Sequence, residues 1–283
     1  MPFQSLIDDD EGVRRLCYDV NALALRYYQG LLTQSETVTR YAEGRGLSVN
    51  TLKVFGAGYA PLEWEGLGNA LTAQGVTKAQ AERVGLVGYS KRGTYDRLRG
   101  RLVLPIKDLQ GRTLGFSGRL LIEDKDAPKY WNTPETPVFA KGKALLGLNQ
   151  AWGAFRRLRC VLLAEGTLDV PALHGQGFRT AVAPLGTSLT HWQADIIADV
   201  KQPVYLLFDA DDAGDKAASR SAVILADAGT RDIYRVNLPP GEDPASLLAV
   251  EGGKERLRGL LKEGGRYSSA EINSIRAEAG RGH

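Results

Sequence analysis

Hydrophobic residues in the first part of the chain recur at helical spacing. Across residues 12–32 the apolar side chains stand three or four positions apart, which predicts an amphipathic helix. A second helical stretch covers about residues 35–45, and Ser48 then stands where the N-cap of a third helix belongs. Residues 66–90 predict short helices separated by glycines. The chain is therefore expected to be mainly helical up to about residue 90.

The pattern changes shortly before residue 100. The stretch RLVLPIKDLQGRTLGFSGRLL (101–121) holds two apolar runs around Asp-Leu-Gln-Gly, which predicts a β-hairpin. The stretch APKYWNTPETPVFAKGKALLG (127–147) is rich in proline and glycine and has no clear period, so we expect a long loop. Helices followed by a hairpin predict an α+β subdomain over residues 1–158.

Strand and helix patterns alternate from residue 160 onward. The strand-like segments are CVLLAEG, TAVAPLG, PVYLLFDADDAG and RDIYRVNLP, and helical segments stand between them. This alternation predicts an α/β fold with a parallel sheet and helices on both faces, over residues 159–245. Residues 246–283 start helical and become rich in glycine and arginine, so we expect a short helical tail with a frayed end.

Composition narrows the class of protein. The 283 residues are 43% hydrophobic and 24% charged, as in ordinary globular proteins. No apolar run approaches the roughly 20 residues that cross a bilayer, and the start MPFQSLIDDDEG is acidic where a signal peptide is basic. We therefore expect a cytoplasmic protein with no membrane partner. The two cysteines, Cys17 and Cys160, have no CxxC spacing, so neither zinc nor a disulfide framework is expected.

Charge is distributed unevenly along the chain. Residues 91–164 hold 15 Lys and Arg against 6 Asp and Glu, a net charge of +9. Residues 165–245 hold 6 against 12, a net charge of −6. This division suits a protein that binds polyanions with one part and metal ions with another, although surface charge is also uneven by chance in many proteins.

Acidic residues follow the predicted strands of the second half. Glu165 ends one strand, and Asp209 and Asp211 end another. The carboxyl ends of parallel strands meet at one edge of the sheet, so these three side chains should lie together. Grouped carboxylates repel one another unless a cation lies among them. Oxygen ligands favour Mg²⁺ or Mn²⁺, so the sequence predicts a divalent metal site.

Two simpler explanations of the acids can be tested on the sequence. An EF-hand loop beginning at Asp209 requires Asp or Asn at position 213 and Glu at position 220, and the chain has Ala213 and Arg220. Helix capping is the expected role of Asp212 and Asp215, at the start of the helix that follows. Capping does not explain why three other carboxylates gather at the same edge.

Several motifs together resemble one family. EGTLD (165–169) and DADDAG (209–214) resemble the E-G-x-x-D and D-x-D pair of the TOPRIM domain, which DnaG-type primases, topoisomerases and some nucleases share. The upstream segments RLRGRLVLPIKDLQGRTLGFSGRLL and PKYWNTPETPVFAKGKALLGL are similar to those of DnaG-type primases, as are AVAPLGTSLT and LPPGEDP. The resemblance runs in order from about residue 12 to residue 260. The chain therefore resembles the RNA polymerase core of a bacterial DnaG-type primase.

The resemblance implies an activity and a metal site. The activity is synthesis of short RNA primers from ribonucleoside triphosphates on a single-stranded DNA template. Glu165, Asp209 and Asp211 would hold more than one Mg²⁺ or Mn²⁺ ion, with Asp169 and Asp243 nearby. Two divalent ions can stabilise both the attacking and the leaving oxygen when a 3′-hydroxyl is joined to an α-phosphate.

The resemblance also implies a basic ridge that grips phosphates of the template and of the nucleotide. Its members would be Arg101, Arg119, Lys129, Asn132 and Lys141. Tyr130 and Trp131 follow Lys129 directly and would stack on an unpaired base. For Trp131, burial within the loop's own packing is an equally good expectation.

The chain departs from the family pattern at several points. Ala245 stands where the family usually has a further aspartate, which weakens the expectation of an outer metal site. Ser117 replaces a glycine, and a serine fits there if its φ angle is negative. The zinc-binding domain of full primases is missing, so a separate zinc-binding module and the replicative helicase are expected partners. The chain fits either a core fragment or a stand-alone relative.

Two other functions remain open at this point. A TOPRIM nuclease would use the same metals to hydrolyse DNA, but it has no evident need for the nucleotide-binding ridge of residues 128–143. A non-catalytic accessory protein would bind nucleic acid without chemistry, and the missing acid at Ala245 motivates this alternative.

Overall fold

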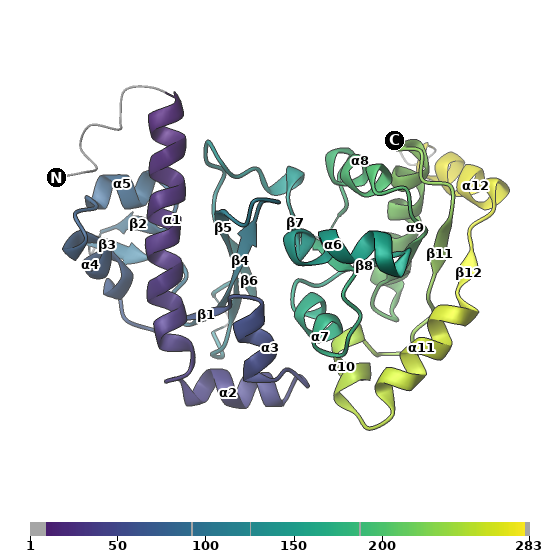
Figure 1. Cartoon of the computed structure of the whole chain (residues 1–283), viewed down its shortest axis with the longest axis horizontal. Coiled ribbons are helices and arrows are strands. Elements are labelled where there is room, and N and C mark those ends of the chain that lie inside the picture. The colour runs from purple at the N-terminus through teal and green to yellow at the C-terminus, as the bar shows by residue number, and fades with distance from the viewer. Residues whose placement is uncertain (1–9, 92, 125, 187, 281–283) are drawn as a thin grey trace. The chain divides into compact units, whose positions relative to one another are not determined.

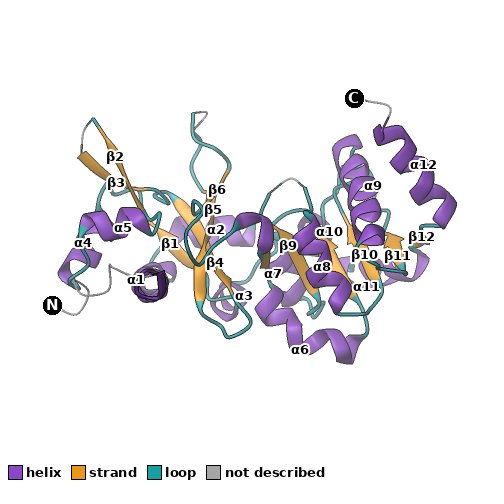
Figure 2. Ribbon diagram, turned by 90° about the horizontal axis from the view of Figure 1, so that it is seen from above, coloured by secondary structure: helices purple, strands orange, loops and turns teal. Residues whose placement is uncertain are grey.

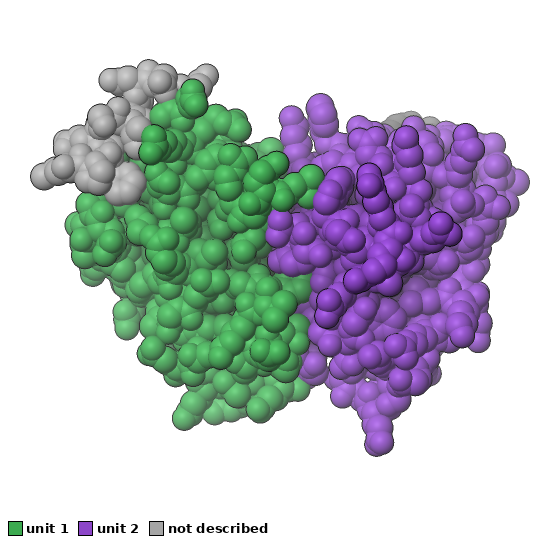
Figure 3. All heavy atoms as spheres, in the orientation of Figure 1, with its two compact units in different colours: residues 1–43, 48–141 green, residues 44–47, 142–283 purple. Residues whose placement is uncertain are grey.

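The computed structural model divides the chain into two compact units, coloured separately in Figure 3. Unit 1 comprises residues 1–43 and 48–141, and unit 2 comprises residues 44–47 and 142–283. The structure describes residues 10–91, 93–124, 126–186 and 188–280. Within these residues, no helix has both the length and the apolar character needed to span a bilayer.

Unit 1 is built around a long helix that packs on a small antiparallel sheet, as Figure 1 shows. Helix α1 buries Leu16 and Val20 completely, and its Tyr28 ring meets the Phe116 ring edge-on at 5.5 Å. The helices are α1 (Asp10–Leu32), α2 (Glu36–Glu43), α3 (Val49–Val54), α4 (Gly66–Ala73) and α5 (Lys78–Arg83). The strands are β1 (Gly58–Ala60), β2 (Val87–Ser90), β3 (Gly93–Asp96), β4 (Arg101–Lys107), β5 (Thr113–Leu120) and β6 (Tyr130–Asn132).

The predicted hairpin and the predicted cap are confirmed. Strands β4 and β5 pair antiparallel on either side of the Asp-Leu-Gln-Gly turn. The side chain of Ser48 accepts a hydrogen bond from the amide of Thr51 at the start of α3.

Four short strands of unit 1, β1, β2, β3 and β6, were not predicted. Strand β2 lies within residues 66–90, where only helices were expected, and it pairs with β3. Strand β6 lies within the stretch predicted to be a loop, and it pairs with β5. Strand β1 follows α3 and pairs with β4. Strands this short show no alternation in the sequence, and pairing with other segments of the chain creates them.

Unit 2 is an α/β domain with a six-stranded sheet in the order β12-β11-β10-β8-β9-β7. The strands are β7 (Leu145–Leu146), β8 (Val161–Ala164), β9 (Ala181–Pro184), β10 (Val204–Leu207), β11 (Ile233–Arg235) and β12 (Gly265–Arg266). The helices are α6 (Leu148–Leu158), α7 (Asp169–Gly175), α8 (His191–Asp199), α9 (Asp212–Asp227), α10 (Pro244–Ala249), α11 (Gly253–Glu263) and α12 (Ser269–Gly280). A short 3₁₀ turn, Lys141–Lys143, precedes them.

The central strands of unit 2 are parallel, as predicted. Strand β10 pairs parallel with β8 on one side and with β11 on the other, and β9 joins β8. In Figure 2, α9 and α12 lie on one side of this sheet and α11 lies on the other. The buried face packs Leu163 and Leu206 against Ala218 and Leu225 of α9.

The edges and the end of unit 2 differ from the prediction. The outer strands β7 and β12 are antiparallel to their neighbours, so the sheet is mixed. The C-terminal segment forms α11, β12 and α12 up to Gly280, and the predicted fraying of the last residues lies outside the described residues. Ile272 of α12 is 7% exposed and joins the core, and this burial explains why the segment is ordered despite its glycine and arginine content.

Along the chain, unit 1 ends at residue 141 and unit 2 continues from residue 142. We had expected this boundary between residues 158 and 159. The difference comes from α6, because Ala151 and Phe155 of this helix are buried in the core of unit 2.

Candidate active site

Two candidate carboxylates stand at the same edge of the sheet of unit 2. Strands β8 and β10 run parallel with Ala164 opposite Leu207. Glu165 follows β8 directly, and Asp209 follows β10 after one intervening residue. The backbone amide of Asp209 donates a hydrogen bond to the Glu165 carboxylate. The register of the sheet therefore sets these two side chains beside each other.

Glu165 lies in an environment that disfavours its charge. Burial raises its pKa, and the neighbouring carboxylates of Asp209 and, more weakly, Asp211 raise it further. The amide of Asp209 and the cation of Arg235 oppose this increase. The Glu165 Oε2 atom is buried and has no hydrogen-bond partner among the described residues. An oxygen in this state is suited to accept a ligand.

Asp211 is the N-cap of α9. Its Oδ1 accepts a hydrogen bond from the amide of Gly214 at 2.7 Å. We had expected Asp212 and Asp215 to stabilise the start of this helix. Both lie in its first turn, but neither is the N-cap, and Asp215 pairs with Arg235 at 2.7 Å. The helix begins earlier than the sequence pattern indicated, because the cap is supplied by a residue of the acidic motif itself.

A glycine holds the D-x-D loop in place. A Cβ atom on Gly214 would lie 2.1 Å from the carbonyl oxygen of Asp209, closer than any real contact allows. The loop is also tied to the segment after β11, because the amide of Ala210 donates to Glu242 and the amide of Gly241 donates to Ala210. These backbone bonds connect the ends of β10 and β11.

Asp243 caps the next helix. Its Oδ1 accepts a hydrogen bond from the amide of Ser246 at 2.6 Å, at the start of α10. Its Oδ2 lies 3.2 Å from the guanidinium of Arg45, which belongs to the same unit. Asp243 therefore caps α10 with one oxygen and forms an ion pair with the other.

Asp169 is the most buried acid of the group. It is 6% exposed, and it accepts a hydrogen bond from the amide of Gly166 at 3.0 Å. Burial raises the pKa of Asp169 to about 8, and the carboxylates of Asp243 and Asp209 contribute, against the opposing amides of Gly166 and Ala245. Without a cation, Asp169 is thus largely protonated at neutral pH.

The five acids are close enough to interact but do not form a ready-made metal site. Among the described residues, no three His, Cys, Asp or Glu side chains are grouped in a way that could hold an ion. Hydrogen bonding offers a reason, since Asp169, Asp211 and Asp243 each direct one oxygen toward a backbone amide. Metal binding by these acids remains a prediction.

In unit 1, Arg119 is the predicted ridge residue with the most distinctive environment. It lies on β5 opposite Tyr130 of β6. Its guanidinium carbon lies 5.0 Å from the Tyr130 ring centre and 5.6 Å from that of Tyr41, a cation–π arrangement. The Nε and Nη1 atoms of Arg119 are buried and have no hydrogen-bond partner in the described structure.

Arg101 has a different environment from the one expected for a phosphate-gripping residue. It is 4% exposed, and its guanidinium donates to backbone carbonyls, including Pro128 at 2.8 Å and Gly118 at 3.3 Å. These bonds fasten the connection between β5 and β6. We therefore regard Arg101 as a residue that positions this connection.

The remaining ridge residues divide between surface and interior. Lys129 and Tyr130 are exposed, and Asn132 lies opposite Ser117 in the strand pair. The backbone amide of Lys141 donates to the carboxylate of Glu135 at 2.9 Å. Trp131 is partly buried and packs against the core of unit 1, which favours the packing role for this residue over base stacking.

Three functional candidates were missed in the sequence. Arg235 is the last residue of β11, and its charge lowers the pKa of Glu165. A charged residue at the carboxyl end of a strand was a usable signal. Arg45 pairs with Asp243 from 198 positions away, and Tyr41 lies beside Arg119. No local pattern marks these two residues.

Two departures from the family pattern can be located. Ser117 is 2% exposed and is not among the described non-glycine residues with positive φ, so the serine fits as anticipated. Ala245 is 2% exposed, and its backbone amide donates to Asp169. The position without its acid still contributes a main-chain bond to the site.

Two protein-family models match the chain. Residues 27–152 match the N-terminal domain of the DNA primase catalytic core, and residues 162–248 match a Toprim-like domain. The first match runs from within α1 into α6, and the second covers the four parallel strands of unit 2.

Similar proteins are DNA primases. The chain is 37% identical to a DNA primase of Aquifex aeolicus, over 88% of this chain and 49% of the relative, and 40% identical to one of Deinococcus radiodurans, over 89% and 44%. The chain thus spans about half the length of these curated relatives.

Solved structures agree with the sequence matches. The zinc-binding and RNA polymerase domains of Aquifex aeolicus primase superpose with a TM-score of 0.84 at 34% identity, covering 97% of this chain and 66% of that one. A DnaG primase catalytic domain bound to single-stranded DNA superposes with a TM-score of 0.80 at 32% identity, covering 94% and 84%. The E. coli primase catalytic core gives 0.77 at 33% identity, covering 92% and 84%.

Proposed function

Because this chain belongs to the DnaG-type primase family, we propose that it is a primase catalytic core that makes short RNA primers on single-stranded DNA. The reaction joins the 3′-hydroxyl of one ribonucleotide to the α-phosphate of the next. The observation that carries the proposal is the buried Oε2 of Glu165, without a partner and beside Asp209 at the carboxyl edge of the sheet.

The acids of unit 2 fit divalent cations by their chemistry. Glu165, Asp209 and Asp211 offer only oxygen atoms, which Mg²⁺ and Mn²⁺ prefer, and Asp169 and Asp243 stand nearby. Burial first, and the neighbouring carboxylates second, raise the pKa values of Glu165 and Asp169, and a bound cation would oppose both effects. Bound divalent ions would stabilise the charge that develops on the attacking and leaving oxygens.

The chain's own residues hold this site in shape. Asp211 and Asp243 fasten the starts of α9 and α10, so that the loops after β10 and β11 have fixed positions. Asp169 bonds the amides of Gly166 and Ala245 and so connects the loop after β8 to α10. Arg45 balances part of the charge of Asp243. These contacts support preorganisation of the carboxylates.

Unit 1 would hold the nucleic acid and the incoming nucleotide. The Nε and Nη1 atoms of Arg119 are buried and have no partner among the described residues, and anionic oxygens that reached them would accept their hydrogen bonds. Lys129 and Tyr130 are exposed beside Arg119. Asn132 ends the same strand, β6, and Lys141 follows it in the chain. The ridge would thus combine charge with one stacking surface.

Partners follow from the same proposal. One similar structure carries a zinc-binding domain together with its RNA polymerase domain, and this chain matches about two thirds of that structure. We expect a zinc-binding module and the replicative helicase to act with this core, and ribonucleoside triphosphates to be its substrates.

The test is primer synthesis with matched variants. The protein is incubated with single-stranded DNA, labelled ribonucleotides and either Mg²⁺ or Mn²⁺, and short products are resolved on a gel. Asp209→Ala and Glu165→Gln should abolish the products. Asp195→Asn changes an exposed acid on α8 and should leave them unchanged.

Two further outcomes of this assay would each indicate a different function. Metal-dependent loss of the DNA without synthesis would mean a TOPRIM nuclease. DNA binding that survives Asp209→Ala, with neither synthesis nor cleavage in the wild-type protein, would mean an accessory protein or a core that requires a zinc-binding module added to the reaction.

A further inference from the structure

Unit 2 contains a cavity away from the acids. It has a volume of about 460 Å³, within the range of small-molecule sites. Cys160 and Thr180, which directly precede β8 and β9, line it. These residues stand at the amino ends of parallel strands, whereas Glu165 and Asp209 follow the carboxyl ends of β8 and β10, so the two sites lie at opposite ends of the same sheet.

The floor of this cavity is an interrupted stack of aromatic rings. Tyr234, Tyr205 and Leu162 stand side by side in the register of three adjacent strands. The two tyrosine rings are stacked, with centres 4.7 Å apart and planes 13° apart. The third position of the row is Leu162, which lines the cavity and carries no ring. Tyr205 and Leu162 both line the cavity, so a planar ring could lie against the Tyr205 ring and the Leu162 side chain.

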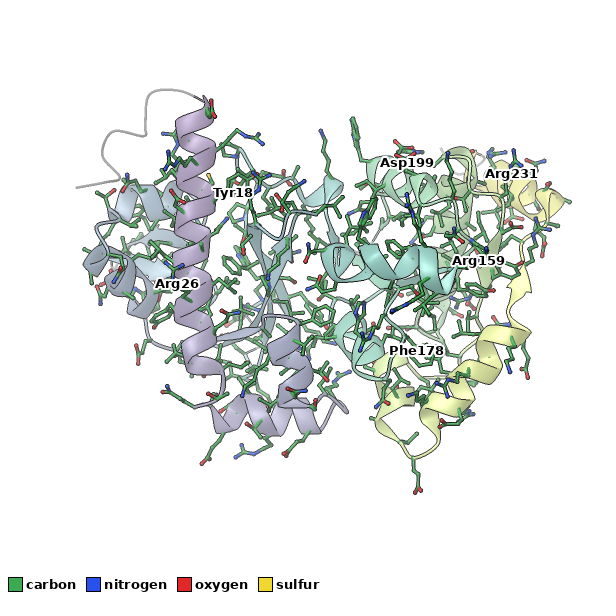
Figure 4. The ribbon with its side chains drawn as sticks, viewed as in Figure 1. Tyr18, Arg26, Arg159, Phe178, Asp199 and Arg231 are labelled. Atoms are coloured by element: carbon green, nitrogen blue, oxygen red, sulfur yellow. The ribbon has the colours of Figure 1, made fainter. Side chains whose placement is uncertain are left out.

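The rim of the cavity is cationic. Arg159 at the end of α6 and Arg258 and Lys262 of α11 line it, and no carboxylate of the described residues does. Arg258 has an exposed partner, Glu255, at 3.6 Å, whereas no ion pair of Arg159 or Lys262 occurs within the described residues. Figure 4 shows Arg159 and Phe178, another lining residue, on the same face of the unit.

We propose that this cavity binds a nucleoside diphosphate. The base would continue the stack from Tyr205 over Leu162, and the phosphates would pair with Arg159, Arg258 and Lys262. An apolar, ring-bordered floor next to an exclusively cationic rim is complementary to a molecule that is flat at one end and anionic at the other. This site is separate from the acids and does not depend on the proposed primase activity.

Chemical modification of the Cys160 thiol can measure whether a ligand occupies the cavity. Its thiol lines the cavity, lies 3.5 Å from the Thr180 hydroxyl and is partly exposed. The other cysteine, Cys17, is completely buried in unit 1. The rate of modification by a thiol reagent, measured at alkaline pH because burial raises the Cys160 pKa, therefore reports on this cavity. A chelator keeps divalent ions out of the reaction.

The four ribonucleoside diphosphates are tested one at a time at millimolar concentration. At least one should slow modification of Cys160 by about fivefold or more, while its nucleoside and pyrophosphate each protect much less. Protection by none of the four would refute the proposal. Equal protection by pyrophosphate alone would refute the stacking site and identify only an anion site.

Single substitutions then test where the protecting diphosphate binds. Lys262→Glu should reduce the affinity for the protecting diphosphate by about fivefold or more, because it reverses one rim charge. Arg220→Glu is the matched control, since it reverses an exposed charge on α9 of the same unit, and it should change nothing. Glu165→Gln should also preserve protection, which separates this cavity from the candidate active site. Protection unaffected by Lys262→Glu would contradict the proposed location.

Discussion

Glu165 differs from its neighbours in that one of its oxygens is buried without a partner. Asp169, Asp211 and Asp243 each support a turn or helix through a backbone amide. Their carboxylates serve the fold whether or not a metal is bound. The Glu165 carboxylate also accepts one amide bond, but burial and the Asp209 charge still raise its pKa. Glu165 is therefore the residue at which stability and chemistry conflict most clearly.

Glu165→Gln should separate these two effects. In chelator, the free energy of unfolding should rise by about 1 kcal/mol or less, because a repelled charge is removed and solvent already screens part of the repulsion. Primer synthesis should fall more than about 100-fold, since a metal-binding oxygen is lost. Urea titrations in chelator and a primer assay give both values. A loss of stability in chelator would mean that Glu165 is structural and would contradict the metal assignment.

At the scale of elements, the start of α9 depends on one close approach. Gly214 allows the first turn of the helix to lie against the carbonyl of Asp209. This contact fixes both the helix and the loop that carries Asp209 and Asp211. The glycine of the D-x-D motif is therefore explained by space, because its φ is not in the left-handed region.

Gly214→Ala should destabilise the protein by more than about 2 kcal/mol, because the added methyl group forces the loop away from the helix. The control is Gly153→Ala on α6, where a Cβ meets nothing within 4 Å. The control should be neutral or stabilise by up to about 1 kcal/mol, as alanine is the better helix former. Chemical denaturation of the two variants compares them directly, and equal stability would show that the loop can relax.

Helix α4 in unit 1 depends on a buried acid, Asp96, which accepts hydrogen bonds from the amides of Leu67 and Gly68. Burial raises the pKa of Asp96 from 3.8 to about 6, although the two amides oppose the change. The folded state thus binds a proton that the unfolded state releases. This contribution to stability is complete below about pH 4 and is lost as the pH rises through about 6.

Asp96→Asn should flatten that dependence. Between about pH 4 and pH 7 the wild-type protein should lose on the order of 2 kcal/mol more stability than the variant, in a comparison of urea midpoints across the range. The difference between the two proteins isolates Asp96 from other titrating groups. Parallel curves would mean that Asp96 has an ordinary pKa.

Long elements of this chain could be predicted from the sequence, whereas very short ones could not. The helices α1 and α9 and the four central strands of unit 2 could be predicted, because long periodic segments and alternating β and α segments carry strong local signals. Strands β1, β6, β7 and β12 have two or three residues each, and only distant pairing defines them. In the site, acids at strand ends were recognisable, whereas Arg45 became visible only through its pair with Asp243.

For the whole molecule, the division of charge has a measurable consequence. The basic segment of residues 91–164 contains the strands of unit 1 that carry the ridge, and the acidic segment of residues 165–245 contains the strand ends of unit 2. Binding to single-stranded DNA should therefore weaken steeply with salt, as bound counterions are released from the phosphates.

Lys129→Ala should lower the slope of log affinity against log salt by about 0.7, the value for one phosphate contact on a single strand. Lys53→Ala removes an exposed lysine from α3 of the same unit and should leave the slope unchanged. Fluorescence anisotropy with labelled DNA at several salt concentrations measures both. The same slope in all three proteins would remove Lys129 from the ridge.

The acids that accept backbone amides also affect what their presence in a related sequence can tell about its activity. A lineage that abandoned primer synthesis but kept the fold would still be selected to retain Asp169, Asp211 and Asp243, because each holds a backbone amide. Their presence in a genome is thus poor evidence that a protein is active. Glu165 also accepts an amide bond, from Asp209, but its Oε2 is satisfied by no described group, and burial and the Asp209 carboxylate disfavour its charge. In an inactive descendant it should be the first of these acids to change.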